Sequence, residues 1–290
     1  MVSVQERTSP MPGRLLDCGD QQLDLSIPQI MGILNVTPDS FSDGGDFFSV
    51  DAALVHAARM VTEGAAIIDV GGESTRPGAA DVPVDQELDR VIPVIETIRR
   101  EFPVIISIDT SKPEVMQAAV TAGATFINDV RALRAEGALE TAANTGAAVC
   151  LMHMQGEPRS MQNNPQYQNV AGEIKLFLKE RVGDCERAGI RRSRMVVDPG
   201  FGFGKTADQN LELLKHLDLL HDLNLPVLAG ISRKSMIGSV LGRKVGERAA
   251  GSIACAVMAV WQGAAIIRAH DVGPTRDAVR MCHAVKTAGL

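Results

Sequence analysis

Eight polar residues that could contact a ligand lie at, or just after, the ends of short apolar runs. They are Asn35, Asp109, Asn128, His153, Asp198, Lys234, Arg268 and His270. The carboxyl ends of parallel strands meet at one end of a barrel or one edge of a sheet, and α/β proteins bind ligands there. If the apolar runs are such strands, these side chains surround a common site.

Four of the eight form a set of hydrogen-bond donors and acceptors, namely Asp109, Asn128, Asp198 and Lys234. A carboxylate accepts, a side-chain amide both donates and accepts, and an ammonium group donates. This set suits a flat heterocycle with an amide-like edge. Any one of these residues could instead be a structural hydrogen-bonding partner, but four at equivalent positions favour a ligand site.

A second set could bind an anion. It combines Asn35, Arg268 and His270 with the loop segment Ser74-Thr75-Arg76. A guanidinium group can bind two phosphate oxygens at once. Arg76 alone is equally well explained as a solvated loop charge, whereas Arg268 directly follows an apolar run and is harder to explain in that way.

The segment GFGFGKT, residues 200–206, ends like a phosphate-binding loop. Such a loop requires glycine at position 199, where this chain has Pro199, and Lys205 does not fit the GxGxxG pattern of dinucleotide-binding loops. We therefore expect a flexible loop that brings Phe203 over a flat ligand. The sequence contains neither a serine nucleophile elbow nor an HExxH pair, so nothing in it predicts covalent catalysis by the protein.

Alternating strand and helix patterns must position these residues. Nearly continuous apolar runs, typical of parallel strands buried on both faces, occupy residues 30–34, 65–70, 104–108, 125–127, 147–152, 195–197, 226–231 and 264–267. Helical patterns occupy residues 52–62, 85–101, 113–122, 135–144, 170–188 and 275–288, and another contains Leu211, Leu214 and Leu217. Asp51 and Ser111 are candidate N-caps. Eight strand–helix repeats favour a (β/α)8 TIM barrel over an open sheet.

The chain shows no linker, so its 290 residues predict one α/β domain. Residues 14–28 are expected to form a short hairpin that turns at Gly19-Asp20 and caps one end of the barrel. We therefore assign residues 1–28 to an N-terminal tail and hairpin, and residues 29–290 to the barrel domain.

The composition excludes several classes of function. A net charge of −6 argues against a non-specific nucleic-acid binder, and 3% aromatic residues argue against stacking platforms for single strands. Residues 249–267 carry no charge, but they are rich in small residues and are interrupted at Gln262-Gly263, so they predict a buried helix followed by a strand rather than a membrane span.

The cysteines and the N-terminus point to a reducing compartment. The five cysteines are an odd number without a CxxC pair, which predicts reduced, mostly buried thiols. Cys150 and His153 would face opposite sides of a strand, so zinc is not expected there. No signal peptide is visible. We expect a cytoplasmic protein.

Seven segments resemble the motifs of bacterial dihydropteroate synthases, in the same order. They are GILNVTPDSFSDGG (32–45), DVGGESTRPGA (69–79), SIDTSK (107–112), INDV (127–130), DPGFGFGK (198–205), GISRKS (230–235) and RAHD (268–271). No motif position that carries chemistry departs from the family pattern. The resemblance implies a TIM barrel that joins 4-aminobenzoate to 6-hydroxymethyl-7,8-dihydropterin diphosphate, releasing diphosphate and 7,8-dihydropteroate in folate biosynthesis.

The resemblance also assigns roles to residues of this chain. It implies that Asp109, Asn128, Asp198 and Lys234 bind the pterin, and that Asn35, Thr75, Arg268 and His270 bind the diphosphate, with Mg²⁺ on Asn35. The aminobenzoate site, where sulfonamides compete, would contain Phe41, Thr75, Arg76, Pro77, Phe203, Lys234 and Ser235. Asp109, Asp43, Arg268 and His270 would take part in catalysis, and the family suggests a homodimer through the last helices.

Two other functions share part of this pattern. A pterin-binding barrel that serves methyl transfer from methyltetrahydrofolate to a corrinoid protein would use the heterocycle set, but it has no use for the anion set or for the segment STRPG at residues 74–78. A non-catalytic paralogue would keep the fold without turnover. Turnover with aminobenzoate separates all three.

Overall fold

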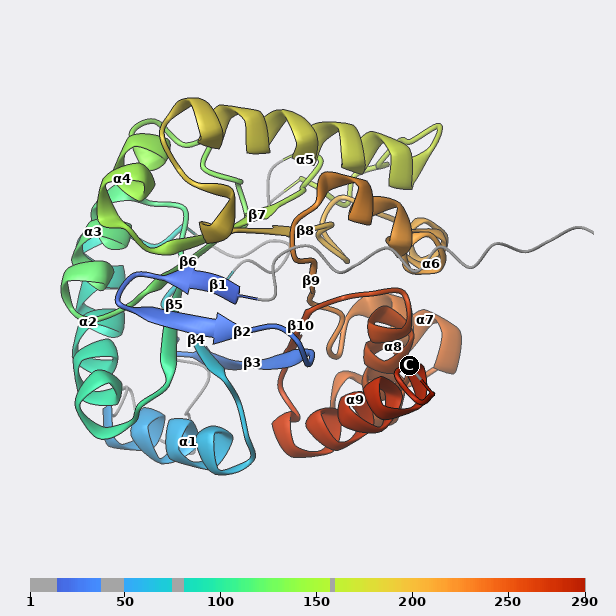
Figure 1. Ribbon diagram of the computed structural model, residues 1–290, viewed down its shortest axis with the longest axis horizontal. Coiled ribbons are helices and arrows are strands. Elements are labelled where there is room, and N and C mark those ends of the chain that lie inside the picture. Colours follow the sequence, from blue (N-terminus) through green and yellow to red (C-terminus); the bar gives the residue numbers. More distant parts are fainter. Residues whose placement is uncertain (1–14, 38–49, 75–80, 157–159, 290) are drawn as a thin grey trace, which may run out of the picture.

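Parallel strands surrounded by helices dominate the structure, a computed structural model that describes residues 15–37, 50–74, 81–156 and 160–289 (Figure 1). Within these residues an eight-stranded parallel sheet has the order β8-β7-β6-β5-β4-β3-β10-β9. A bridge between Val197 and Val227 joins its two edges. The strands are β3 Gln29–Asn35, β4 Ile67–Gly71, β5 Ile105–Asp109, β6 Phe126–Asp129, β7 Ala148–Met152, β8 Met195–Asp198, β9 Leu228–Ala229 and β10 Ile266–Ala269. The sheet therefore closes into the expected (β/α)8 barrel.

Helices form the outer layer of the barrel (Figure 1). They are α1 Val50–Thr62, α2 Val84–Glu101, α3 Pro113–Thr121, α4 Ala138–Thr145, α5 Val170–Arg187, α6 Ala207–Lys215, α7 Ser235–Leu241, α8 Ala249–Trp261 and α9 Val272–Lys286. Within the described ranges, short 3-10 helices cover Arg192–Arg194, Leu217–Leu223 and Val245–Glu247. No helix in the described part of the chain is long and apolar enough to cross a membrane.

The period-two alternation of strands decides which side chains enter the barrel. In β5, Ile106 and Ile108 pack in the main core between sheet and helices, whereas Ile105 belongs to the cluster inside the barrel. The same alternation turns Ser107 and Asp109 inward. Because every strand follows this rule, polar residues two positions after an inward apolar residue lie near the carboxyl end of the barrel interior.

The N-terminal hairpin closes the opposite end of the barrel, as expected. Its strands β1 Leu15–Cys18 and β2 Gln21–Asp24 pair antiparallel around the turn at Gly19-Asp20. Leu16, Cys18 and Leu23 are buried in the same cluster as Phe126 inside the barrel, and Figure 1 shows the hairpin crossing the strand ends. This apolar plug leaves the carboxyl end of the barrel for the polar residues.

Several local expectations were wrong. Ser111 does not cap α3, because its hydroxyl contacts the Asp129 carboxylate and Lys112 precedes the helix without a side-chain cap. Asp51 lies inside the first turn of α1. The strand expected over 226–231 is only two residues long, and α7 was not expected at all. After β9 the chain turns sharply at Arg233, which has a φ of +58°.

Candidate active site

Asp69 organises one half of the barrel mouth. Its Oδ1 accepts a hydrogen bond from Ser107 Oγ at 2.6 Å, and its Oδ2 accepts from Asn128 Nδ2 at 3.1 Å and from Arg268 Nε at 2.6 Å. A second nitrogen of Arg268, Nη2, donates to Asp109 Oδ2 at 2.7 Å. Residues from β4, β5, β6 and β10 therefore form one network, which we call the carboxylate half.

Electrostatics in the carboxylate half depend on desolvation and on charge pairing. Burial raises the pKa of Asp109 to about 7, although Arg268 acts to lower it. Burial alone would lower the pKa of Arg268, but Asp69 and Asp109 outweigh that cost and raise it above its ordinary value. Arg268 thus stays charged, and it faces carboxylates as well as any anion that enters the mouth.

Asp198 and Lys234 lie in the other half of the mouth, which we call the lysine half. Asp198 Oδ1 accepts from the Gly200 N–H at 2.7 Å. The Lys234 ammonium donates to the Phe201 carbonyl and lies 4.5 Å from the centre of the Phe203 ring. Burial raises the pKa of Asp198, with Lys234 opposing, and burial lowers the pKa of Lys234 to about 8, with Asp198 opposing.

The two halves meet at Gly230. A Cβ placed on this glycine would lie 3.8 Å from Arg268 Cβ and 3.9 Å from Asp198 Oδ2. A Cβ on Gly71 would likewise lie 3.8 Å from Asp109 Oδ2 and 3.9 Å from Asn35 Oδ1. Glycine at these two positions leaves the space between the functional side chains open, so a flat ligand could contact both halves.

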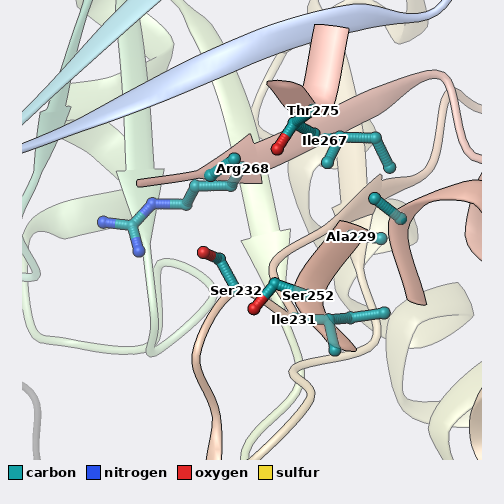
Figure 2. A pocket seen from close by; sticks show the side chains of 9 residues that line it. Ala229, Ile231, Ser232, Ser252, Ile267, Arg268 and Thr275 are labelled. Carbon is teal, nitrogen blue, oxygen red and sulfur yellow. The ribbon is translucent and has the colours of Figure 1, made fainter. Parts of the chain in front are cut away.

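The loops after β9 and β10 are joined by side chains. Ser232 Oγ lies 2.9 Å from His270 Nδ1, and the Arg233 guanidinium binds the Asp271 carboxylate at 2.6 and 3.1 Å. Beside these loops lies a small pocket whose wall includes Ser232 and Arg268. Figure 2 shows the guanidinium of Arg268 extending away from Ile267 and Thr275, which line the same pocket. These contacts hold the loops after β9 and β10 together.

Glu73 links the two described ends of the segment between β4 and α2. Glu73 Oε1 accepts from the Val82 N–H at 2.9 Å, and Glu73 Oε2 lies 2.6 Å from Lys112 Nζ. Lys112 also contacts Glu87, which is fully buried in α2. The described ends of this segment are thus fixed to α2 and to the loop after β5.

The structure brings most of the expected residues into one mouth. Asp109, Asn128 and Arg268 share the carboxylate half, and Asp198, Lys234 and Phe203 share the lysine half. Ser235 is exposed at the start of α7. Five expected residues, Phe41, Asp43, Thr75, Arg76 and Pro77, lie outside the described residues.

One expectation needs correction, and one residue was missed. The loop at residues 200–206 was expected to be flexible, but it is held in place by Lys205, which is 2% exposed and donates to the Gly200 and Phe203 carbonyls. Asp69 was missed because only the residues at the ends of apolar runs were considered. A carboxylate inside the run Ile67–Gly71, at an inward position, was the signal that could have found it.

The described residues offer no cysteine pair and no cluster of three or more acidic, histidine or cysteine ligands. The five cysteines are buried and free. In the described ranges, no group of three or more His, Cys, Asp and Glu side chains could hold a metal ion. A cation here would therefore need oxygen ligands from amides, substrate or water.

The chain is similar to proteins of known activity over almost its whole length. The pterin binding enzyme family matches residues 31–270. A dihydropteroate synthase of Escherichia coli K12 is 56% identical over 92% of this chain and 94% of that protein. A Yersinia pestis dihydropteroate synthase, solved with a sulfonamide drug, superposes with a TM-score of 0.91 at 52% identity, covering 94% and 100% of the two chains. The Xanthomonas albilineans enzyme in complex with 7,8-dihydropteroate has a TM-score of 0.87 at 48% identity, covering 94% and 99%.

Proposed function

We infer that this chain, which belongs to the dihydropteroate synthases of the pterin-binding enzyme family, is a transferase that condenses 6-hydroxymethyl-7,8-dihydropterin diphosphate with 4-aminobenzoate. Its products are 7,8-dihydropteroate and diphosphate, in a step of folate biosynthesis. The observation that carries this conclusion is the 56% identity to a dihydropteroate synthase over 92% of the chain. The barrel mouth adds a physical reason, because the residues of the heterocycle set and the guanidinium group of Arg268 lie there together.

We propose that the pterin ring is held by Asp109, Asn128, Asp198 and Lys234. Asn128 and Asp198 are buried, and each projects inward from a different strand of the barrel. Carboxylate acceptors and an ammonium donor complement the N–H groups and the carbonyl of a pterin edge. Each of these hydrogen bonds should contribute to pterin affinity, because a polar group that is buried without a partner costs free energy.

The diphosphate would be bound by Asn35, Thr75, Arg268 and His270. A guanidinium group has five N–H donors, and the Arg268 contacts to Asp69 and Asp109 involve only Nε and Nη2. Arg268 therefore keeps donors for an anion while its carboxylate partners hold it in place. The 2.9 Å contact with Ser232 holds the His270 imidazole in the loop that follows Arg268.

The oxygen chemistry of the carboxylate half fits Mg²⁺. This ion takes one or two protein oxygens and completes its shell with phosphate oxygens and water. The Asn35 amide oxygen lies beside Asp109 near Gly71 and would be its protein ligand. When bound, Mg²⁺ supplies charge neutralisation for the diphosphate leaving group.

The reaction needs charge stabilisation more than proton transfer. The amino group of aminobenzoate is uncharged at neutral pH, so its nitrogen can attack the pterin methylene without a strong base. The C–O bond breaks with its electron pair leaving on the diphosphate, the N–C bond forms, and the nitrogen loses a proton. We propose that Asp109 and Asp43 stabilise the developing cation, while Arg268 and His270 stabilise the departing anion.

Aminobenzoate would bind next to the lysine half. The residues proposed for its site are Phe41, Thr75, Arg76, Pro77, Phe203, Lys234 and Ser235. Among these, Phe203 and Lys234 contact each other directly, and Ser235 follows at the start of α7. Sulfonamides, which share the aniline ring, are expected to compete for this site.

We also propose that the protein is a cytoplasmic homodimer formed through α8 and α9. These helices pack against each other, and their outer faces expose Met258, Trp261, Met281 and Val285, which are 47–65% exposed. Large exposed apolar side chains on two helices that pack together favour a protein interface. A dimer should halve its apparent mass when Trp261 and Met281 are replaced by lysine, as measured by sedimentation.

The experiment that tests the function is diphosphate release with pterin diphosphate and Mg²⁺, in the presence and absence of 4-aminobenzoate. Release that depends on aminobenzoate and yields dihydropteroate supports the proposal. Binding of pterin without any release would instead support a methyl-transfer barrel or a non-catalytic paralogue. Addition of a sulfonamide should reduce release, and excess aminobenzoate should restore it.

A further inference from the structure

The Lys205 ammonium group lies inside the protein with a complete set of acceptors. Its Nζ donates to the Gly200 carbonyl at 2.8 Å and to the Phe203 carbonyl at 2.9 Å, and it lies 3.1 Å from His153 Nδ1. An ammonium group has three N–H donors, so each has one partner. Three satisfied donors account for a buried lysine without any ligand.

These contacts tie the loop after β8 to the end of β7. The carbonyls of Gly200 and Phe203 belong to the loop, whereas His153 directly follows β7. His153 is buried and uncharged, because burial and then the nearby Lys205 lower its pKa to about 2. A neutral imidazole can accept at Nδ1, so the ring serves as an anchor for the ammonium group.

The backbone of the loop is also constrained by close packing. Gly200 and Gly204 have φ values of +69° and +60°. A Cβ at these positions would lie 1.9 Å from the His153 carbonyl oxygen and 2.4 Å from the Gln155 carbonyl oxygen. The loop therefore follows one path against the end of β7, and Lys205 bonds to it from within.

That path determines what surrounds Lys234. The loop presents the Phe201 carbonyl to the Lys234 ammonium, and it places the Phe203 ring 4.5 Å from the same group. Lys205 donates no hydrogen bond to Lys234 or to another side chain of the mouth, although its charge acts through space on Asp198 and Lys234. Its hydrogen bonds act on the aminobenzoate side of the mouth through the loop that carries Phe201 and Phe203.

We propose that Lys205 is a positioning residue that fixes the loop of residues 200–204 so that Phe203 and Lys234 are preorganised for 4-aminobenzoate. This inference rests on the proposed function, since it concerns the aminobenzoate side of the same site. It gives the GKT segment a role that differs from phosphate binding. A side chain that matches the length of lysine but lacks its donors should release the loop.

The test is a double-mutant cycle between Lys205→Met and Phe203→Leu, with KM for 4-aminobenzoate as the readout. Each single substitution should raise this KM about tenfold, because a buried hydrogen-bond set or a ring contact is lost. In the Lys205→Met protein, Phe203→Leu should add less than about threefold, since the ring is already displaced. Lys179→Met, on the exposed surface of α5, is the matched control and should leave the KM unchanged.

A purely structural role of Lys205 predicts a different pattern. The melting temperature would fall, the KM for aminobenzoate would stay within about twofold, and the two substitutions would act independently, which would overturn the inference. If Lys205→Met does not fold, Lys205→Gln, which retains two N–H donors, takes its place in the same double-mutant cycle with Phe203→Leu. Wild-type protein without aminobenzoate-dependent turnover would instead overturn the proposed function, and this inference with it.

Discussion

The two halves of the barrel mouth hold their charges by different means. In the carboxylate half, side chain pairs with side chain, as Arg268 does with Asp69 and Asp109. In the lysine half, Lys234 donates to the backbone carbonyl of Phe201, and the loop that carries this carbonyl is held from within the protein by Lys205, which donates to the Gly200 and Phe203 carbonyls. The difference predicts which change damages each half. The carboxylate half is sensitive to the loss of a charge, and the lysine half is sensitive to the path of the backbone.

The largest effect is expected from Arg268→Ala. This change leaves the buried Asp69 and the largely buried Asp109 without their cation, and breaking such a pair costs about 3–5 kcal/mol of unfolding free energy. Urea denaturation at pH 8 would measure it. Arg59→Ala, which breaks an exposed pair with Glu63, is the control and should cost at most about 1 kcal/mol.

Lowering the pH should reduce the loss of unfolding free energy that Arg268→Ala causes. Burial raises the pKa of Asp109 to about 7, well above its ordinary value of 3.8. The carboxyl group therefore takes up a proton as the pH falls through this range, and a neutral group no longer needs the cation. A loss that is equally large at pH 5 and pH 8, or no larger than that of Arg59→Ala, would contradict the charge-pair description of this half.

The second effect tests the backbone of the lysine half. Gly200→Ala should lower the unfolding free energy by about 3 kcal/mol, because backbone strain at positive φ adds to the clash with the His153 carbonyl oxygen. Gly146 has a similar φ of +75°, but a Cβ there would meet nothing within 4 Å. Gly146→Ala should therefore lower the unfolding free energy by only about 1–2 kcal/mol. Equal losses in the two variants would show that the close packing at Gly200 does not affect stability.

Asp198→Ala probes the ligand side of the lysine half. We expect pterin diphosphate to bind at least about tenfold more weakly, because a buried N–H of the ligand loses its acceptor. Calorimetry gives the affinity, and Asp208→Ala on the exposed first turn of α6 is the control. Asp198→Asn can still accept from Gly200, so a loss in this variant too would separate ligand binding from loop support. Unchanged affinity in both would remove Asp198 from the pterin site.

The same division explains how much of the site could be predicted from the sequence. Apolar runs and helical patterns were sufficient for the barrel, and the residues at the strand ends of the carboxylate half were found. Asp69 was missed because it lies two residues before the end of β4, and only the inward alternation with Ile67 marks it as part of the mouth. Side-chain pairing across strands follows from alternation and register, so this half is largely encoded in local patterns.

The residues of the lysine half, Asp198, Lys234 and Phe203, were also predicted, but the hydrogen bonds that hold its loop were not. The sequence shows that Lys205 follows a glycine-rich segment, but its acceptors are carbonyls whose directions depend on the φ values of Gly200 and Gly204. Its third partner, His153, is 52 residues away in the chain. Contacts of this kind depend on the tertiary path of a loop, which residue types alone do not specify.

The smallest effect concerns the protonation of Lys234. Burial lowers its pKa to about 8 from an ordinary 10.5, while Asp198 acts in the opposite direction. Lys234 is therefore an ammonium donor below pH 8 and loses its proton above it, so kcat/KM for pterin diphosphate should fall as the pH rises through about 8. Lys234→Arg should abolish this decline because a guanidinium group stays charged. Asp198→Asn should move it to lower pH, since the carboxylate that raises the Lys234 pKa is gone, and a profile unaffected by either change would assign the titration to another group.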